Sequence, residues 1–384
     1  MRAKKVVVLG STGSIGVNTL DVIARFPEKF KVVGITAYNN LPLFEKQVRQ
    51  FSPRYVAVGG EGIKDLRKNF PHLKFFDVNS ELSVIAAMPE VDIAVIGISG
   101  SAALGPFLSA IRAGKTVAPA NKEAIVIAGS LIMQAAKKHR AKIIPIDSEQ
   151  SAIFQCLEGQ DRRHLKKVYL TASGGPLYRL PQSKFNALTV EQILLHPRWK
   201  MGKKITVDSA TLMNKGFEVI EAKHLFDLKL EEIEVVIHPE AIIHSMVSFK
   251  DGAILAQLGI TDMRLPIQYA LTYPQRCETN LKDLDFFQLK QLTFEKPDTK
   301  KFPSLALAIY TAKQGGTLPG VLNAADEEAV KAFLDEKISF SAIYRVVEKV
   351  ILQHKIKKDP ALEDIYHADR WAREAVKSVL SRIK

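Results

Sequence analysis

The chain has 384 residues, of which 47% are hydrophobic and 25% are charged, and its formal net charge is +13. This composition is that of a folded protein with two or three domains and excludes a disordered chain. The basic residues occur in short scattered groups, without a continuous stripe or a known nucleic-acid-binding motif, so we expect no nucleic acid and no membrane as a partner and interpret the excess charge as a solvated surface that attracts anionic ligands.

The amino terminus continues from two lysines directly into a strand pattern, without an apolar leader or a cleavage site, which predicts a cytoplasmic location. The two cysteines, Cys156 and Cys277, are far apart in the sequence and have no CxxC spacing. We therefore expect two core thiols, and neither a disulfide nor a thiolate metal site.

Strand and helix patterns alternate along the amino-terminal part of the chain. Apolar, β-branched runs predict strands at residues 5–10, 30–37, 55–59, 92–97, 115–120 and 142–147. Apolar residues at helical spacing predict helices at residues 19–26, 42–51, 105–114 and 125–139. This alternation predicts a doubly wound parallel sheet, which is a Rossmann-like α/β domain.

A second group of strands is predicted at residues 167–173, 233–239 and 245–259, and Asp251-Gly252 within the last range is a typical hairpin turn. Amphipathic patterns then predict helices up to the end of the chain. The predicted fold class is α/β, with an amino-terminal Rossmann-like parallel sheet, a central α+β domain and a carboxy-terminal helical domain. The predicted boundaries are residues 1–148, 149–278 and 303–384 for the three domains and 279–302 for a charged linker.

A glycine-rich turn, GSTGSIG, follows the first predicted strand. Gly10, Gly13 and Gly16 are spaced every three residues between that strand and a helix, as in turns that bind the pyrophosphate of a dinucleotide. A purely structural turn is the alternative interpretation. The second strand ends in Ala37-Tyr38-Asn39-Asn40, without the carboxylate that binds the ribose of NAD, which favours NADPH over NADH.

Two carboxylates, Asp147 and Glu149, are predicted at the carboxyl end of a strand, where a period of two directs both to one side. Neighbouring carboxylates repel each other unless a cation or a proton lies between them, although Asp147 could instead cap a helix that begins near Gln150. Glu218 and Glu221, three apart on a later helix, are candidates for a third ligand. A site with oxygen ligands alone indicates Mg²⁺ or Mn²⁺.

Ser209, Asn214 and Lys215 precede or open the helix of that third carboxylate, so a hydroxyl, an amide and an ammonium group could bind one phosphate there. Ser173, beside two glycines, is a fourth candidate. Taken singly, each of these residues is more typical of a helix cap or a surface position. Their combination indicates an anion pocket.

Residues 196–202 (HPRWKMG) form a polar stretch between a helix pattern and a strand pattern, and contain Trp199. The tryptophan is either a buried anchor or part of a lid that covers a substrate and moves about Gly202. His238 and His244 flank the end of a strand, and the pattern alone assigns them to the core.

These residues lie in motifs that resemble those of the 1-deoxy-D-xylulose 5-phosphate (DXP) reductoisomerase family. The similar segments are residues 10–16, 110–116, 121–123, 145–157, 170–176, 196–222 and 237–247. Separate blocks of this length make the resemblance specific, and together they extend over nearly the whole chain.

The resemblance implies a divalent metal, Mg²⁺ or Mn²⁺ with Co²⁺ as a further candidate, bound by Asp147, Glu149 and Glu218, and it selects Glu218 over Glu221. The implied substrate site comprises Ser148, Glu149, Ser173, His196, Ser209, Asn214, Lys215 and Glu218. The implied NADPH site comprises Gly10, Ser11, Thr12, Gly13, Ser14, Ile15, Asn40, Asn121, Lys122, Glu123 and Gly202. The implied catalytic residues are Lys122, Glu149, His196, Trp199 and His244, with a flap over residues 196–202 that also carries Met201.

The family's reaction and assembly also follow as expectations. The metal would stabilise negative charge on substrate oxygens during a retro-aldol and aldol rearrangement, and NADPH would then reduce the resulting aldehyde. The resemblance implies a homodimer. The chain departs from the family pattern at Tyr38 and Asn39, where a glycine and a basic residue usually precede the asparagine, so the contact with the 2′-phosphate of NADPH is not implied.

Two other functions are compatible with parts of the pattern. A different NADP enzyme, such as a semialdehyde or homoserine dehydrogenase, would share the glycine turn but would not need the three carboxylates, and its turnover would survive a chelator. A non-catalytic basic binding protein would show salt-sensitive affinity for nucleic acid and would not oxidise NADPH.

Overall fold

The structure of the protein is a computed structural model that describes residues 2–59, 63–195 and 202–382. The chain forms two units. Unit 1 comprises Met1–Ala124, Ser130–Ser151 and Asp262–Leu281, and unit 2 comprises Ile125–Gly129, Ala152–Thr261 and Lys282–Lys384. The boundaries of these two units differ from those of the three predicted domains. The three domains stay a prediction.

Unit 1 is built on a parallel sheet with the strand order β4-β3-β2-β1-β5-β6. Its strands are β1 (Lys4–Leu9), β2 (Phe30–Ala37), β3 (Tyr55–Val58), β4 (Lys74–Phe76), β5 (Ile93–Ile96) and β6 (Thr116–Pro119). The residues Val6 to Leu9 of β1 are all fully buried, as expected for a central strand covered on both faces. The predicted Rossmann-like sheet is confirmed.

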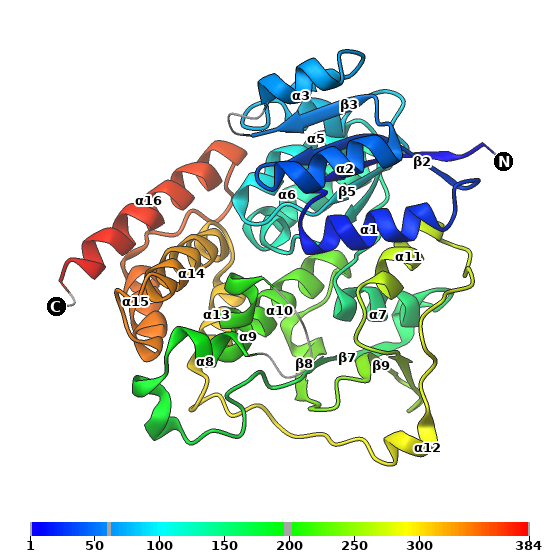
Figure 1. Ribbon diagram of the computed structural model, residues 1–384. Helices are drawn as coiled ribbons and strands as arrows, with labels where there is room; N and C mark the ends of the chain where they lie inside the picture. Colours follow the sequence, from blue (N-terminus) through cyan, green and yellow to red (C-terminus); the bar gives the residue numbers. More distant parts are fainter. Residues whose placement is uncertain (1, 60–62, 196–201, 383–384) are drawn as a thin grey trace. The chain divides into compact units, whose positions relative to one another are not determined.

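The helices of unit 1 alternate with these strands. They are α1 (Ser14–Ala24), α2 (Leu41–Phe51), α3 (Ile63–Asn69), α4 (Leu82–Ala86), α5 (Leu104–Arg112), α6 (Glu123–His139), which passes through unit 2 over Ile125–Gly129, and α11 (Arg264–Thr272). Helices α1 and α2 lie on the same side of the sheet (Figure 1). Helix α11 comes from much later in the chain and contacts α1, where Arg25 donates a hydrogen bond of 2.9 Å to Gln268.

The predicted strand over residues 142–147 is wrong. This segment runs beside β6 and forms one parallel bridge, from Ile143 to Val117, but no strand. Pro145 has no N–H group to donate to a strand partner, and helix α7 (Ser148–Leu157) begins three residues later. Asp147 and Glu149 therefore do not lie on one face of a strand, because Glu149 is in the first turn of a helix.

Unit 2 contains a four-stranded sheet with the order β10-β9-β7-β8. Its strands are β7 (Leu165–Ala172), β8 (Ile233–Ile237), β9 (Ile243–Phe249) and β10 (Ile254–Leu258). Strands β9 and β10 form the predicted antiparallel hairpin, and Gly252 in its turn has a φ of +93°. Strand β10 is an edge strand of this sheet.

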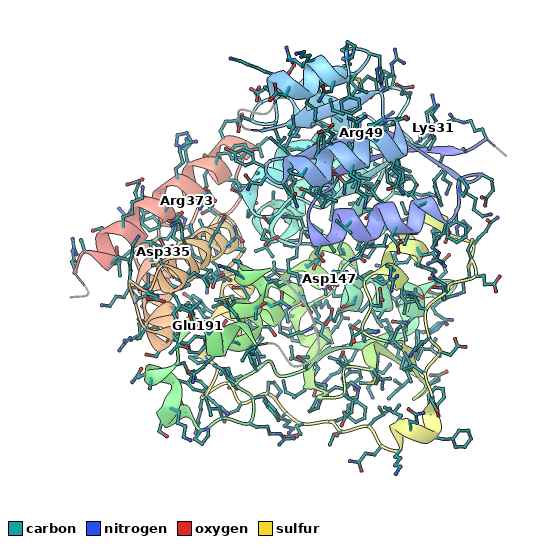
Figure 2. The ribbon with its side chains drawn as sticks, viewed as in Figure 1. Lys31, Arg49, Asp147, Glu191, Asp335 and Arg373 are labelled. Atoms are coloured by element: carbon teal, nitrogen blue, oxygen red, sulfur yellow. The ribbon has the colours of Figure 1, made fainter. Side chains whose placement is uncertain are left out.

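The other elements of unit 2 are helical. They are the part of α7 from Ala152 onward, α8 (Val190–Leu194), α9 (Lys203–Thr211), α10 (Met213–Leu225), α12 (Phe286–Leu289), α13 (Pro303–Gln314), α14 (Leu318–Leu334), α15 (Phe340–Gln353) and α16 (Leu362–Leu380). The predicted carboxy-terminal helices are confirmed. Arg373 of α16, labelled in Figure 2, forms ion pairs with Glu327 and Glu328 of α14 and thereby joins these two helices.

Hydrophobic clusters show how the helices of unit 2 are held. Ile153 and Cys156 of α7 lie in one buried cluster with Val219 and Ala222 of α10. Cys156 is buried, whereas Cys277 is only partly buried, so the expectation of two core thiols holds for the first alone.

In the described ranges of the chain, no helix has the length and apolar character needed to cross a membrane.

Candidate active site

The glycine-rich turn joins β1 to α1 in unit 1. A Cβ atom at Gly16 would lie 2.2 Å from the carbonyl oxygen of Gly10, so the turn can close this tightly only with glycine at that position. The Ser11 hydroxyl donates a hydrogen bond of 2.7 Å to Gln47. Gly13 precedes α1, and no side chain caps the first turn of the helix, so its N–H groups can bind a phosphate.

The turn lies where the strand order reverses, because β1 pairs with β2 on one side and with β5 on the other. Ligands of doubly wound sheets bind at this point, outside the carboxyl ends of the strands. The segment after β5 is fixed by Asn121, whose amide donates to the carbonyl oxygens of Ile98 and Gly100 at 2.9 and 3.2 Å. The structure thus brings the glycine turn and Asn121 to the same edge of unit 1.

The residues after β2 lie beside the same turn. The Thr12 hydroxyl donates to the carbonyl oxygen of Asn39 at 3.3 Å, and Asn40 caps α2 with its side chain. Tyr38 is 63% exposed, so its ring is available to a bound molecule. Ser14 and Ile15 open α1, and Glu123 opens α6.

Asp147 and Glu149 lie at the amino end of α7 (Asp147 is labelled in Figure 2). Asp147 accepts a hydrogen bond of 3.2 Å from the backbone N–H of Glu149, and Ser148 donates one of 2.6 Å to the Glu149 carboxylate. Lys122 and Asp147 are both buried and form an ion pair of 2.6 Å. The predicted helix cap at Asp147 is therefore present, together with a second partner for its carboxylate.

Ser173 and Ser209 both lie beside Gly175 in unit 2. The Ser173 hydroxyl accepts a hydrogen bond of 3.3 Å from the N–H of Gly175. A Cβ atom at Gly175, whose φ is +72°, would lie 2.5 Å from the carbonyl oxygen of Ser209. The loop after β7 therefore packs directly on the backbone of α9.

Asn214 and Lys215 lie in the first turn of α10, and both contact Glu218 one turn later. The Asn214 amide donates a hydrogen bond of 2.6 Å to the Glu218 carboxylate, which is also paired with the Lys215 ammonium group. Lys215, Glu218 and Glu221 are all buried. A buried ammonium group beside a carboxylate keeps that carboxylate ionised, as a metal ligand must be.

His244, in β9, is almost fully buried. The pKa of His244 is lowered to about 4, mainly by burial. Hydrogen bonds with Ile260 and Gly259 act to raise this pKa, whereas the nearby His238 and Lys215 act to lower it. His244 is therefore neutral at physiological pH and can donate or accept a hydrogen bond without adding charge. His238, which β8 precedes, is also buried and accepts hydrogen bonds of 3.2 Å from the N–H groups of Ile242 and Ile243.

The neutral state of His244 predicts a pH-dependent stability. Between about pH 6.5 and pH 4 the unfolded chain binds a proton at this residue and the folded chain does not, so stability falls as the pH falls. We expect His244→Gln to lose this dependence. Its free energy of unfolding, relative to the native chain, should rise by about 2 kcal/mol between about pH 7 and about pH 5.

Urea unfolding at the two pH values measures this difference. His164→Gln, at an exposed histidine before β7, is the matched control and should follow the native chain. An unchanged difference for His244→Gln would show that His244 is protonated in the folded protein.

Most of the predicted flap, including His196, Trp199 and Met201, lies outside the described residues. Only Gly202 of the flap lies within them, directly before α9. The strand pattern after the flap is wrong, because residues 203–211 form α9. Its β-branched residues Thr206 and Val207 are buried in unit 2, and this packing outweighs their preference for strands.

A charged group that joins α9 to α14 and contains two buried carboxylates was not predicted from the sequence. Lys204 forms ion pairs with Asp208 of the same helix and Asp326 of α14. The spacing of four between Lys204 and Asp208 is a helical signal, but it is informative only once residues 203–211 are assigned to a helix.

A glycine turn lies at the reversal point of a Rossmann-like sheet, and buried lysine–carboxylate pairs lie at the amino ends of α7 and α10. These features define a class of protein: a dinucleotide-dependent oxidoreductase of Rossmann type that acts on an anionic substrate. Three family models match the chain. They are 1-deoxy-D-xylulose 5-phosphate reductoisomerase over residues 6–129, its C-terminal domain over residues 143–226, and the DXP reductoisomerase C-terminal domain over residues 258–375. The chain belongs to the 1-deoxy-D-xylulose 5-phosphate reductoisomerase family.

Individual relatives match this chain over almost their full length. The chain is 50% identical over 376 residues to 1-deoxy-D-xylulose 5-phosphate reductoisomerase of Pelotomaculum thermopropionicum, covering 96% of this chain and 97% of the relative. The solved enzyme from Zymomonas mobilis in complex with NADPH is 40% identical, with a TM-score of 0.92 and coverage of 98% and 99%. A DOX-P reductoisomerase solved with NADPH, fosmidomycin and magnesium is 37% identical, with a TM-score of 0.93 and 99% coverage of both chains.

Proposed function

We propose that the protein converts 1-deoxy-D-xylulose 5-phosphate to 2-C-methyl-D-erythritol 4-phosphate, by a metal-dependent isomerisation followed by an NADPH-dependent reduction, in the non-mevalonate isoprenoid pathway. Family membership over nearly the whole chain supports the reaction. One observation links the proposal to named residues: helix α7 begins at Ser148 in unit 1, has Glu149 in its first turn, and continues from Ala152 in unit 2.

Asp147, Glu149 and Glu218 are the proposed metal ligands. Helix α7 supports this set, because Ile153 and Cys156, one and two turns after Glu149, pack in the same cluster as Val219. The donors are all carboxylate oxygens, which fit Mg²⁺ or Mn²⁺ and, as a weaker candidate, Co²⁺. When bound, the cation supplies positive charge to substrate oxygens while the carbon skeleton rearranges.

The chain's own residues prepare these ligands and are proposed to bind the substrate. Lys122 pairs with Asp147, and Lys215 pairs with Glu218, so each of these two carboxylates has a buried cation beside it. The proposed phosphate site consists of Ser173, Ser209, Asn214 and Lys215, of which the two serines meet at Gly175 and the other two open α10. Ser148, Glu149, Glu218 and His196 complete the proposed substrate site.

The proposed NADPH site follows the edge of the sheet in unit 1. Its members are Gly10, Ser11, Thr12, Gly13, Ser14, Ile15, Asn40, Asn121, Lys122, Glu123 and Gly202. The uncapped first turn of α1 supports the pyrophosphate position. Bound NADPH supplies the hydride, and the chain's residues hold it in place and exclude water.

Lys122, Glu149, His196, Trp199 and His244 are the proposed catalytic residues. Lys122 is a buried ammonium group next to a proposed metal ligand, and His244 is a buried neutral imidazole near Lys215. The flap over residues 196–202 is proposed to cover the substrate, with His196 and Trp199 against it.

A homodimer and a cytoplasmic location complete the proposal. The dimer is supported by the exposed edge of the sheet in unit 2, where Ile254 and Leu255 of β10 are 55% and 40% exposed. An apolar edge strand of this kind is usually paired or covered in a native protein.

The proposed function is tested by following NADPH absorbance after DXP is added to the purified protein. We expect oxidation that stops with a chelator and returns with Mg²⁺. Turnover that survives the chelator would instead indicate a metal-independent NADP dehydrogenase, and the carboxylate assignment would be wrong.

A further inference from the structure

A group of buried charges links α9 to α14 in unit 2. Lys204 pairs with Asp208 and, at 2.9 Å, with Asp326, and its ammonium group lies 4.7 Å from the centre of the Phe217 ring. The side chains of Asp208 and Asp326 are 3% and 1% exposed. Within this group only the Lys204 side chain, which is 27% exposed, reaches solvent. Its positive charge offsets the cost of burying the two carboxylates.

The group contains more acceptors than donors. Burial, followed by the charge of Asp326, raises the pKa of Asp208 well above its usual range. Asn323 lies one turn before Asp326 on the same face of α14, and its side-chain amide has no hydrogen-bond partner among the described residues. Breaking such a buried pair costs far more than a surface ion pair contributes, so the positions of α9 and α14 are strongly coupled.

Helix α9 carries Ser209 directly after Asp208. The carbonyl oxygen of Ser209 packs on Gly175, and Gly175 donates its N–H group to Ser173. The start of α9 has no side-chain cap, because Gly202 is in the capping position. The contacts of Lys204 and Asp208 with Asp326 therefore fix a helix whose own first turn is weakly held.

We propose that Lys204 and Asp326 are positioning residues, which act through Asp208 to hold Ser209 against the loop of Ser173 and so set the affinity for the substrate phosphate. This inference rests on the proposed function, in which Ser173 and Ser209 bind that phosphate. Asp326 itself lies outside the proposed site.

Asp326→Leu tests the proposal, because leucine has a similar size but offers no acceptor to Lys204. We expect the KM for DXP to rise about tenfold, the effect of one lost hydrogen bond, while the KM for NADPH stays within about twofold and kcat changes less than the KM for DXP. Asp326→Asn keeps a side chain of the same shape with an acceptor oxygen for Lys204. The asparagine variant should therefore restore a native KM for DXP.

Val330→Ala is the matched control for a loss of packing, since Val330 is buried one turn after Asp326 on the same face of α14 and takes no part in the ion pair. It should destabilise the protein without changing the KM for DXP. If Val330→Ala raises that KM as much as Asp326→Leu, or if Asp326→Leu leaves it native, the positioning role is overturned. If Asp326→Leu does not fold, Asp326→Ser, which is too short to reach Lys204, carries the same expectation.

Ser209→Ala separates this inference from the proposed function. A raised KM for DXP in Ser209→Ala, with a native KM in Asp326→Leu, overturns the positioning role alone. A native KM in Ser209→Ala overturns both the phosphate assignment and the positioning role.

Discussion

Glu149→Gln is expected to lower turnover by at least about 10²-fold at concentrations of DXP, NADPH and Mg²⁺ that saturate the native protein. Glutamine preserves the size of the side chain and the hydrogen bond from Ser148, but it removes the charge that a divalent cation requires. Raising the Mg²⁺ concentration should restore part of the activity, because the remaining ligands still bind the ion weakly. Steady-state turnover over a range of Mg²⁺ concentrations measures both effects.

Glu158→Gln is the matched control for this substitution. Glu158 directly follows the carboxyl end of the same helix and is exposed, so the variant loses the same charge away from the proposed metal site. It should keep native kcat and native Mg²⁺ dependence. Equal losses in the two variants would show that the negative charge of the region, and not a bound cation, explains the result.

Gly16→Ala is expected to disrupt the glycine turn even without a cofactor. The new Cβ atom would lie 2.2 Å from the carbonyl oxygen of Gly10, and backbone atoms cannot give way as a flexible side chain can. We expect a loss of about 3 kcal/mol in the free energy of unfolding, together with a loss of NADPH binding. Thermal unfolding of the cofactor-free protein and titration with NADPH measure these two effects.

Gly13→Ala distinguishes the fold of the turn from its contact with a ligand. At Gly13 the nearest atom to a Cβ is the Gly10 carbonyl oxygen at 3.4 Å, an ordinary contact. The cofactor-free variant should therefore unfold like the native chain, while its affinity for NADPH falls at least about tenfold, because the methyl group faces the proposed pyrophosphate. If Gly13→Ala binds NADPH with native affinity, the dinucleotide does not approach this part of the turn.

Much of unit 1 could be predicted because its strands are apolar runs separated by helical patterns. The apolar run at residues 30–37 predicts both ends of β2 correctly. Strand β4 has only three residues and is too short to show any periodicity. The segment at 142–147 has the composition of a strand, but Pro145 interrupts its hydrogen bonding. The composition of a segment does not show whether a neighbouring strand can hydrogen-bond with each of its backbone N–H and C=O groups.

The candidate site was predictable where its members are neighbours in sequence. Asn214, Lys215 and Glu218 are within one helical turn, and a helix pattern is enough to bring them together. The pair of Lys204 and Asp326 was not predictable in the same way, because it joins helices from distant parts of the chain. Such contacts depend on tertiary packing, which periodicity does not encode.

During synthesis on the ribosome, the strands of the amino-terminal sheet emerge long before α11 is made. Helix α1 packs against α11, and Arg264 of α11 pairs with Asp21 of α1, so these contacts cannot form until residue 272 has left the exit tunnel. All four strands of the other unit's sheet are synthesised in the meantime. The order of translation thus delays completion of the nucleotide-binding half until after the other unit's sheet has been made.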